Sequence, residues 1–235
     1  MVRTCISILL GSLLWAAPAP DACCQPPAGG RRPQAPLSSI HAHLCGFHFY
    51  NGDPARQLVA HHYCARVSPD VMQCVIYDAD RRQARLVGVE YIVSAKLFRT
   101  LPEEERKLWH SHRFEVMSGQ LAAPGLTEAA EKTLMKDLVL TYGKTWQTWQ
   151  VDRNDQVPMG IPQLLMGFTA DGQIDPRLVA GRDREAGLST ADKKARRADL
   201  PAGKVEPGAD AWQRGETLQL GIGPVRAGLP GGNRN

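Results

Sequence analysis

The chain has 235 residues, of which 43% are hydrophobic and 22% are charged. This composition is ordinary for a soluble globular protein, and it excludes collagen-like, disulfide-dense and multi-span membrane proteins. The formal net charge of +4 comes from the two ends of the chain, because the central part is nearly neutral. A nucleic-acid-binding protein needs a basic face that meets the phosphates. We therefore expect no nucleic-acid partner.

The start of the chain has the pattern of a secretory signal peptide. Arg3 precedes an apolar run from Ile6 to Ala17, which is too short to span a bilayer but matches the apolar region of such a signal. The sequence predicts a signal peptide over residues 1–22 and a Pro/Gly-rich linker over residues 23–37. We therefore expect an exported protein that is periplasmic, envelope-anchored or extracellular.

Four of the six cysteines carry structural predictions. Cys23 and Cys24, at the start of the linker, are candidates for the lipid-modified cysteine of a bacterial lipoprotein. Cys64 and Cys74 flank a turn signal, Ser68-Pro69-Asp70, and could face each other across a hairpin. Export would make a disulfide between them plausible. The alternative is two separate buried thiols.

The folded part is expected over residues 38–222, before a flexible tail at 223–235. Strands are expected at Gln57–Arg66, Gln73–Asp78, Arg85–Ser94, Trp109–Met117, Thr145–Val151 and Thr217–Ile222. Helices are expected from Ser38 to Leu44, from Leu101 over a short stretch, from Thr127 to Gly143, and after Ser189. Strands and helices do not alternate as βαβ units. The pattern therefore predicts a single α+β domain with a mainly antiparallel sheet flanked by helices.

All seven histidines fall between residues 41 and 112. Residues two apart in a strand share a face, so His110 and His112 would project together from the strand expected there. His61 and His62 would lie on opposite faces of their strand, so only one of them could join the pair.

Two glutamates could complete a metal site with these histidines. Two or three histidines with a carboxylate and an open coordination position form a catalytic zinc or iron site, in which bound water becomes a nucleophile. The sequence thus predicts a Zn or Fe site with ligands drawn from His110, His112, His62, His61, Glu90 and Glu115. The alternative is that the histidines line a hydrogen-bonded core. No catalytic residue is assigned.

Five stretches of the sequence together resemble one known family. They are GFHFYNGDPARQ at Gly46–Gln57, HHYC at His61–Cys64, GVEYIVS at Gly88–Ser94, LFRTLPEEERKLWHSH at Leu97–His112 and YGKTWQTWQVDR at Tyr142–Arg153. This combination resembles the oil body-associated protein family of plants, fungi and bacteria. The resemblance runs from about residue 38 to residue 220.

The resemblance implies a role without enzymatic activity. Plant members associate with seed oil bodies, and no catalytic residue comes with the family. The export signal indicates a bacterial, exported relative. Its apolar run is too short for a lipid-embedded hairpin, so any contact with a lipid or membrane surface would be peripheral. We expect a lipid- or envelope-associated protein, and the alternative is a metal-dependent enzyme of the hydrolase or oxygenase type.

Overall fold

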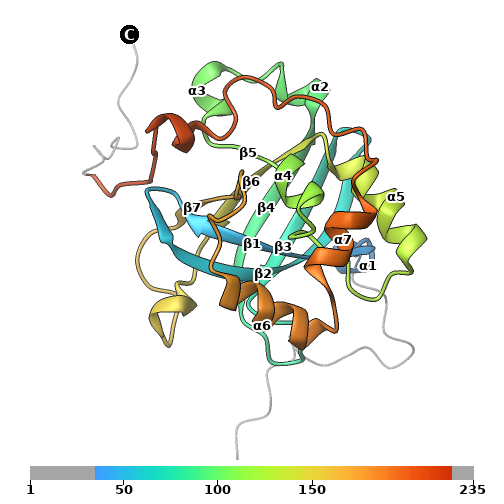
Figure 1. Ribbon diagram of the computed structural model, residues 1–235. Coiled ribbons are helices and arrows are strands. Elements are labelled where there is room, and N and C mark those ends of the chain that lie inside the picture. The colour runs from blue at the N-terminus through green and yellow to red at the C-terminus, as the bar shows by residue number, and fades with distance from the viewer. Residues whose placement is uncertain (1–34, 224–235) are drawn as a thin grey trace, which may run out of the picture.

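The computed structural model describes residues 35–223 (Figure 1). The predicted signal peptide, the lipidation candidates Cys23 and Cys24, and nearly all of the predicted tail lie outside the described residues. The described part forms one domain. None of the helices between residues 35 and 223 is long and apolar enough to cross a membrane.

The sheet has seven strands, and every pairing in it is antiparallel. They are β1 (Ala42–Tyr50), β2 (Asp53–Ser68), β3 (Val71–Tyr77), β4 (Leu86–Ser94), β5 (His110–Ser111), β6 (Thr141–Gln147) and β7 (Gln163–Met166). Six strands close into a barrel in the order β1, β2, β3, β4, β6, β7, because β4 pairs with β6 and β7 pairs with β1. Strand β5 pairs with β6 only. The predicted single α+β domain with an antiparallel sheet is confirmed.

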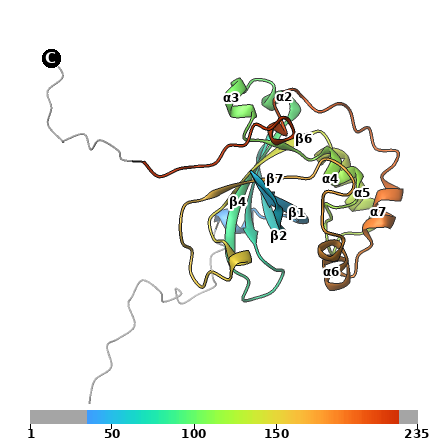
Figure 2. The ribbon, with the colours of Figure 1, turned by 60° about the vertical axis from the view of Figure 1, so that its left-hand side comes forward.

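Most of the helices lie beside the barrel. They are α1 (Ala35–Ser38), α2 (Ala95–Phe98), α3 (Glu103–Arg106), α4 (Arg113–Met117), α5 (Glu128–Leu138), α6 (Pro176–Ala186) and α7 (Thr190–Arg196), with 3-10 turns η2 (Val151–Arg153) and η3 (Ala211–Arg214). Helices α4 to α7 gather on one side of the barrel (Figure 2). The hydroxyls of Thr127 and Ser189 cap α5 and α7 as predicted.

Two predicted elements near the histidines are wrong. The stretch from Ser38 to Leu44 was expected to be helical, but Ala42–Tyr50 forms strand β1. The last seven residues of β1 are buried, so the strand lacks the polar–apolar alternation of a half-exposed strand. The expected strand Trp109–Met117 is a strand only at His110–Ser111 and continues as α4.

Two further predicted elements differ from the structure because of contacts with distant parts of the chain. Helix α5 ends at Leu138 instead of Gly143, because residues from Thr141 onward pair with β4 in the barrel. The segment Thr217–Ile222 is not a strand. It is held against the barrel by its Gln219 side chain, which donates to the carbonyls of Asn51 and Leu164.

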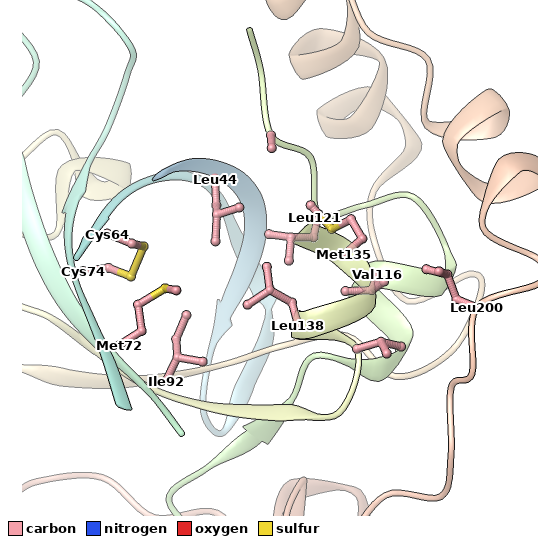
Figure 3. Close-up of a cluster of buried hydrophobic side chains, with 12 residues drawn as sticks. Leu44, Cys64, Met72, Cys74, Ile92, Val116, Leu121, Met135, Leu138 and Leu200 are labelled. Carbon is pink, nitrogen blue, oxygen red and sulfur yellow. A yellow bond between two sulfur atoms is a disulfide. The ribbon is translucent and has the colours of Figure 1, made fainter. Parts of the chain in front are cut away.

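The barrel interior has an apolar layer at each end. One layer continues into the contacts with α4 and α5, and it includes Leu44, Met72, Ile92, Leu121 and Leu138 (Figure 3). The layer at the other end is built from Tyr50, Leu58, Ala60, Ile76, Val87 and Leu165. Between these two layers the strands direct His48, His62 and Glu90 inward, and the candidate site is built around them.

Cys64 and Cys74 form a disulfide inside the first layer, at positions directly opposite each other on β2 and β3 (Figure 3). The turn between the two strands follows Ser68, where the sequence placed it.

We expect reduction of this disulfide to lower the free energy of unfolding by about 2.5–3 kcal/mol, because it closes a loop of about ten residues in the unfolded chain. Urea unfolding with and without dithiothreitol measures the difference. A double variant, Cys64→Ala/Cys74→Ala, is the control and should not respond to the reductant. An equal urea midpoint for the oxidised and reduced native chains would contradict the expectation.

Candidate functional site

Six ionisable side chains meet in the middle layer of the barrel. Each is at most 4% exposed, and they are His48, His62, Glu90, His110, His112 and Glu115. Strand β1 supplies the first, β2 the second and β4 the third. His110 lies on β5, His112 is the residue before α4, and Glu115 lies in α4. Together they form the histidine–glutamate cluster.

Glu90 is the centre of the histidine–glutamate cluster. Its Oε2 lies 2.8 Å from Nε2 of His62 and 3.7 Å from Nε2 of His48. Its Oε1 lies 3.1 Å from Nε2 of His112 and 3.5 Å from Nε2 of His110. The Nε2 atoms of His48 and His62 are 3.1 Å apart. All four imidazoles therefore direct the same ring nitrogen toward one carboxylate.

The tautomer of His112 follows from its neighbours. The hydroxyl of Thr141 donates its hydrogen to the carbonyl of Leu138 at 2.7 Å. Its oxygen must therefore accept from Nδ1 of His112, which is 2.8 Å away. In a neutral imidazole this leaves a lone pair on Nε2 facing Glu90. A lone pair 3.1 Å from a carboxylate oxygen is repulsive, so a proton or a cation must lie between them.

Other polar atoms of the histidine–glutamate cluster have no hydrogen-bond partner within residues 35–223. These are both ring nitrogens of His110, Oε1 of Glu115, and Nδ1 of His48 and of His62. A buried polar atom without a partner costs about 1–3 kcal/mol. A cavity of about 10 Å³ lies beside these groups, lined in part by His48, His62, Glu90, His112 and Glu115. That volume is about the size that one water molecule or one ion occupies.

Two glycines leave room for the cluster. Gly143 on β6 pairs with Ile92 on one side and with His110 on the other. A Cβ at this position would collide with Oε1 of Glu90 and would lie 2.7 Å from Nε2 of His110. A Cβ at Gly167, just after β7, would collide with Oε1 of Glu115. The backbone is thus shaped around these carboxylates.

The two glutamates are in opposite electrostatic environments. Burial raises the pKa of Glu90, but the charge of His62 and hydrogen bonds from the histidines outweigh it, and the pKa lies well below its usual range. Burial, followed by the charge of Glu90, holds the pKa of Glu115 well above its usual range. Burial lowers the pKa of His110 and of His48. Glu90 is therefore the charged member of the pair.

The structure brings together five of the six residues proposed from the sequence as metal ligands. His61 is the exception, because it faces the opposite side of β2 from His62, as strand alternation requires. Its Nδ1 lies 3.2 Å from Nε2 of His43 instead. His48 was missed because Ala42–Tyr50 was not expected to be a strand. As a strand, it places His48 on the same face as Leu44, which pairs with His62.

Comparisons with known proteins identify relatives of this chain. A family model described as "Protein of unknown function (DUF1264)" matches residues 34–201. Oil body-associated protein 1B of Arabidopsis thaliana is 43% identical over 79% of this chain and 78% of its own length. Oil body-associated proteins 1A and 2A of Zea mays are 45% and 46% identical over 79% and 76% of this chain, and over 79% and 73% of their own lengths. The chain belongs to the oil body-associated (DUF1264) family.

The matched region of this DUF1264 protein contains the whole histidine–glutamate cluster and every strand of the barrel. It does not contain η3 or the segment after it. No solved structure matches the chain significantly. The family is described as one of unknown function, and the comparisons give no support to the alternative of a metal-dependent enzyme.

Proposed function

We propose that this protein associates peripherally with a lipid surface and does so without enzymatic activity. The observation that carries the proposal is the 42–46% identity to relatives named for their association with oil bodies. The cavity of about 10 Å³ beside the histidine–glutamate cluster is too small for an organic substrate. A binding role therefore fits the fold better than turnover in the barrel interior.

One end of the barrel carries exposed apolar side chains suited to this contact. Val157 and Met159, in the loop after η2, are 56% and 52% exposed. Leu218 and Leu220, in the segment after η3, are 39% and 47% exposed. We call these four residues the apolar rim. Burying one such side chain against lipid contributes about 1.5–3 kcal/mol.

Hydrogen bonds link η2, which precedes the loop, and the tail to residues at the β1–β2 end of the barrel. On the side of the loop, the hydroxyl of Tyr50 donates to Asp152 at 2.6 Å, and Arg56 donates to the same carboxylate. On the side of the tail, Asn51 donates to the carbonyl of Leu218 at 3.0 Å. The two segments therefore belong to the barrel end remote from α5, and Figure 1 shows both beside the β1–β2 turn.

We expect a charge in the apolar rim to weaken binding to lipid droplets. Met159→Asp and Leu220→Asp should each reduce the bound fraction roughly tenfold, because each removes an apolar contact and adds a carboxylate. Flotation with triacylglycerol droplets coated with phosphatidylcholine measures the bound fraction. Leu126→Asp is the matched control, since Leu126 is 48% exposed and precedes α5 at the other end of the barrel.

Two outcomes would overturn the lipid proposal. The first is a native chain that stays with the unbound fraction. The second is an equal loss of binding for Leu126→Asp and the two rim variants, since that would mean that no particular end of the barrel contacts lipid.

Export is a further part of this proposal. It is supported by the apolar run Ile6–Ala17 and agrees with the disulfide between Cys64 and Cys74, since disulfides persist in oxidising compartments. Mass spectrometry of the mature chain tests it. Export predicts loss of about 22 residues, or a lipid on Cys23 or Cys24, and an intact N-terminus in the cell of origin would contradict it.

A further inference from the structure

We propose that the barrel interior binds one divalent transition-metal ion, zinc or iron(II), through Glu90 and Nε2 atoms drawn from His48, His62, His110 and His112. This inference goes beyond lipid association and does not depend on it. It rests on the spacing of the donor atoms, on the unmatched lone pairs and on the space left for them.

The spacing of the donor atoms fits one central ion. Histidine nitrogens and carboxylate oxygens bind zinc at about 2.0–2.2 Å, which places neighbouring ligands of one ion roughly 3–3.5 Å apart. The separation is 3.1 Å between His48 and His62, and 2.8 Å between His62 and Glu90. It is 3.1 Å between His112 and Glu90. The donors form two adjoining groups that share Glu90, because Oε2 faces His48 and His62, whereas Oε1 faces His110 and His112.

Unmatched acceptors also indicate a cation. In a neutral imidazole, Nε2 of His112 presents a lone pair to Glu90, because Nδ1 donates its hydrogen to the hydroxyl oxygen of Thr141. Nε2 of His110 is fully buried, has no hydrogen-bond partner among the described residues, and lies 3.5 Å from the same carboxylate. A divalent ion would bind the lone pair of His112 and balance the charge of Glu90 in this buried setting.

The chemistry of the donors selects the class of metal. Imidazole nitrogens with one carboxylate suit zinc, iron and their first-row neighbours, whereas calcium and magnesium prefer sets made only of oxygens. Cys64 and Cys74 are joined in a disulfide and supply no thiolate, and the free Cys45 lies on the opposite face of β1 from His48. Iron(II) and zinc share this ligand chemistry, so an elemental assay must distinguish them.

The burial of the proposed ligands indicates an ion with a structural role. The ligands come from β1, β2, β4, β5 and the residue before α4, and each is at most 3% exposed. An ion here would tie these elements together inside the barrel. Because the unfolded chain has no preformed site, the binding free energy would add to the stability of the fold.

Elemental analysis of the full chain, purified without chelators, tests the proposal. We expect about one equivalent of zinc or iron per chain. We also expect the melting temperature to fall when 1,10-phenanthroline removes the ion and to recover when the ion is returned. His62→Ala should lose more than 90% of the metal. His61→Ala is the matched control, because the neighbouring residue on the same strand faces away from the cluster, and it should retain the metal.

Three results would overturn the proposal. One is a native chain that holds less than a tenth of an equivalent and whose melting temperature does not respond to added zinc or to iron(II) under anaerobic conditions. The second is equal metal loss for His61→Ala and His62→Ala. The third is metal that His62→Ala retains in full. The first result would favour protons, instead of an ion, between the histidines and Glu90, and the other two would place the metal elsewhere.

If His62→Ala fails to fold, the native apoprotein still tests the metal proposal. Cobalt(II) added to the native apoprotein should give visible d–d bands with the intensity of a four- or five-coordinate site. Weak bands identical to those of the hexa-aquo ion would contradict a site of this kind. Lipid flotation of the metal-free chain separates the two proposals, because the apolar rim contains none of the ligands.

Discussion

Gly143→Ala should destabilise the protein by about 3–5 kcal/mol, the cost expected when a buried charge network is broken. The added methyl group would collide with Oε1 of Glu90 and would lie 2.7 Å from Nε2 of His110. Strand β6 cannot move aside easily, because it pairs with β4, β5 and β7. The carboxylate would have to leave the centre of the cluster. Thermal unfolding should show a melting temperature roughly 10 °C below that of the native chain.

Gly181→Ala is the matched control for this variant. Gly181 lies within α6, and a Cβ there meets nothing within 4 Å. The same substitution should therefore raise the stability by about 0.5–1 kcal/mol, because alanine is the better helix former. If the two variants melted at the same temperature, the backbone would not be shaped around the cluster as described.

Glu90→Gln should have the second large effect, a loss of about 3–5 kcal/mol, although the side chain keeps its size. The four imidazoles would lose the carboxylate that all of them approach, and a neutral amide would balance neither a protonated imidazole nor a bound ion. Urea unfolding measures the change in stability, and elemental analysis of the same sample should show the metal gone.

Glu115→Gln provides the contrast within the same cluster. Burial and the neighbouring charge of Glu90 hold the pKa of Glu115 well above its usual range, which favours the uncharged acid form. Replacing it with an uncharged amide of the same shape should cost no more than about 1 kcal/mol. Equal losses for the two variants would mean that the two carboxyl groups share their charge.

The antiparallel hairpin of β2 and β3 illustrates what the sequence predicted well. The turn at Ser68-Pro69-Asp70 and the β-rich runs on either side of it are local signals, and they placed Cys64 opposite Cys74. Strand alternation also separated His62 from His61. These inferences succeeded because each depends on neighbours within a few residues.

The sequence did not predict that His48 joins the cluster or how His112 reaches it, because both depend on tertiary structure. Strand β1 is buried on both faces, so no alternation marks it, and His48 looked unrelated to the other histidines. His110 and His112 do reach the cluster together, but one lies on the short strand β5 and the other precedes α4. The structure therefore brings His110 and His112 together for a reason that strand periodicity did not supply.

The apolar rim and the histidine–glutamate cluster occupy different parts of one barrel. The rim lies at the β1–β2 end of the barrel, and the cluster lies between the two apolar layers of the interior. A bound ion would stiffen the barrel on which the rim segments rest without contacting lipid. Loss of the ion is thus expected to lower stability first, and lipid binding only when the barrel unfolds.

The most direct measurement is an anomalous difference map from crystals of the untreated protein, recorded at the zinc and iron absorption edges. We expect one strong peak inside the barrel, about 2.0–2.2 Å from the Nε2 atoms of His48 and His62 and from Glu90. The contradicting result is a map without a peak at either edge, with the four imidazoles linked to the carboxylate by hydrogen bonds alone.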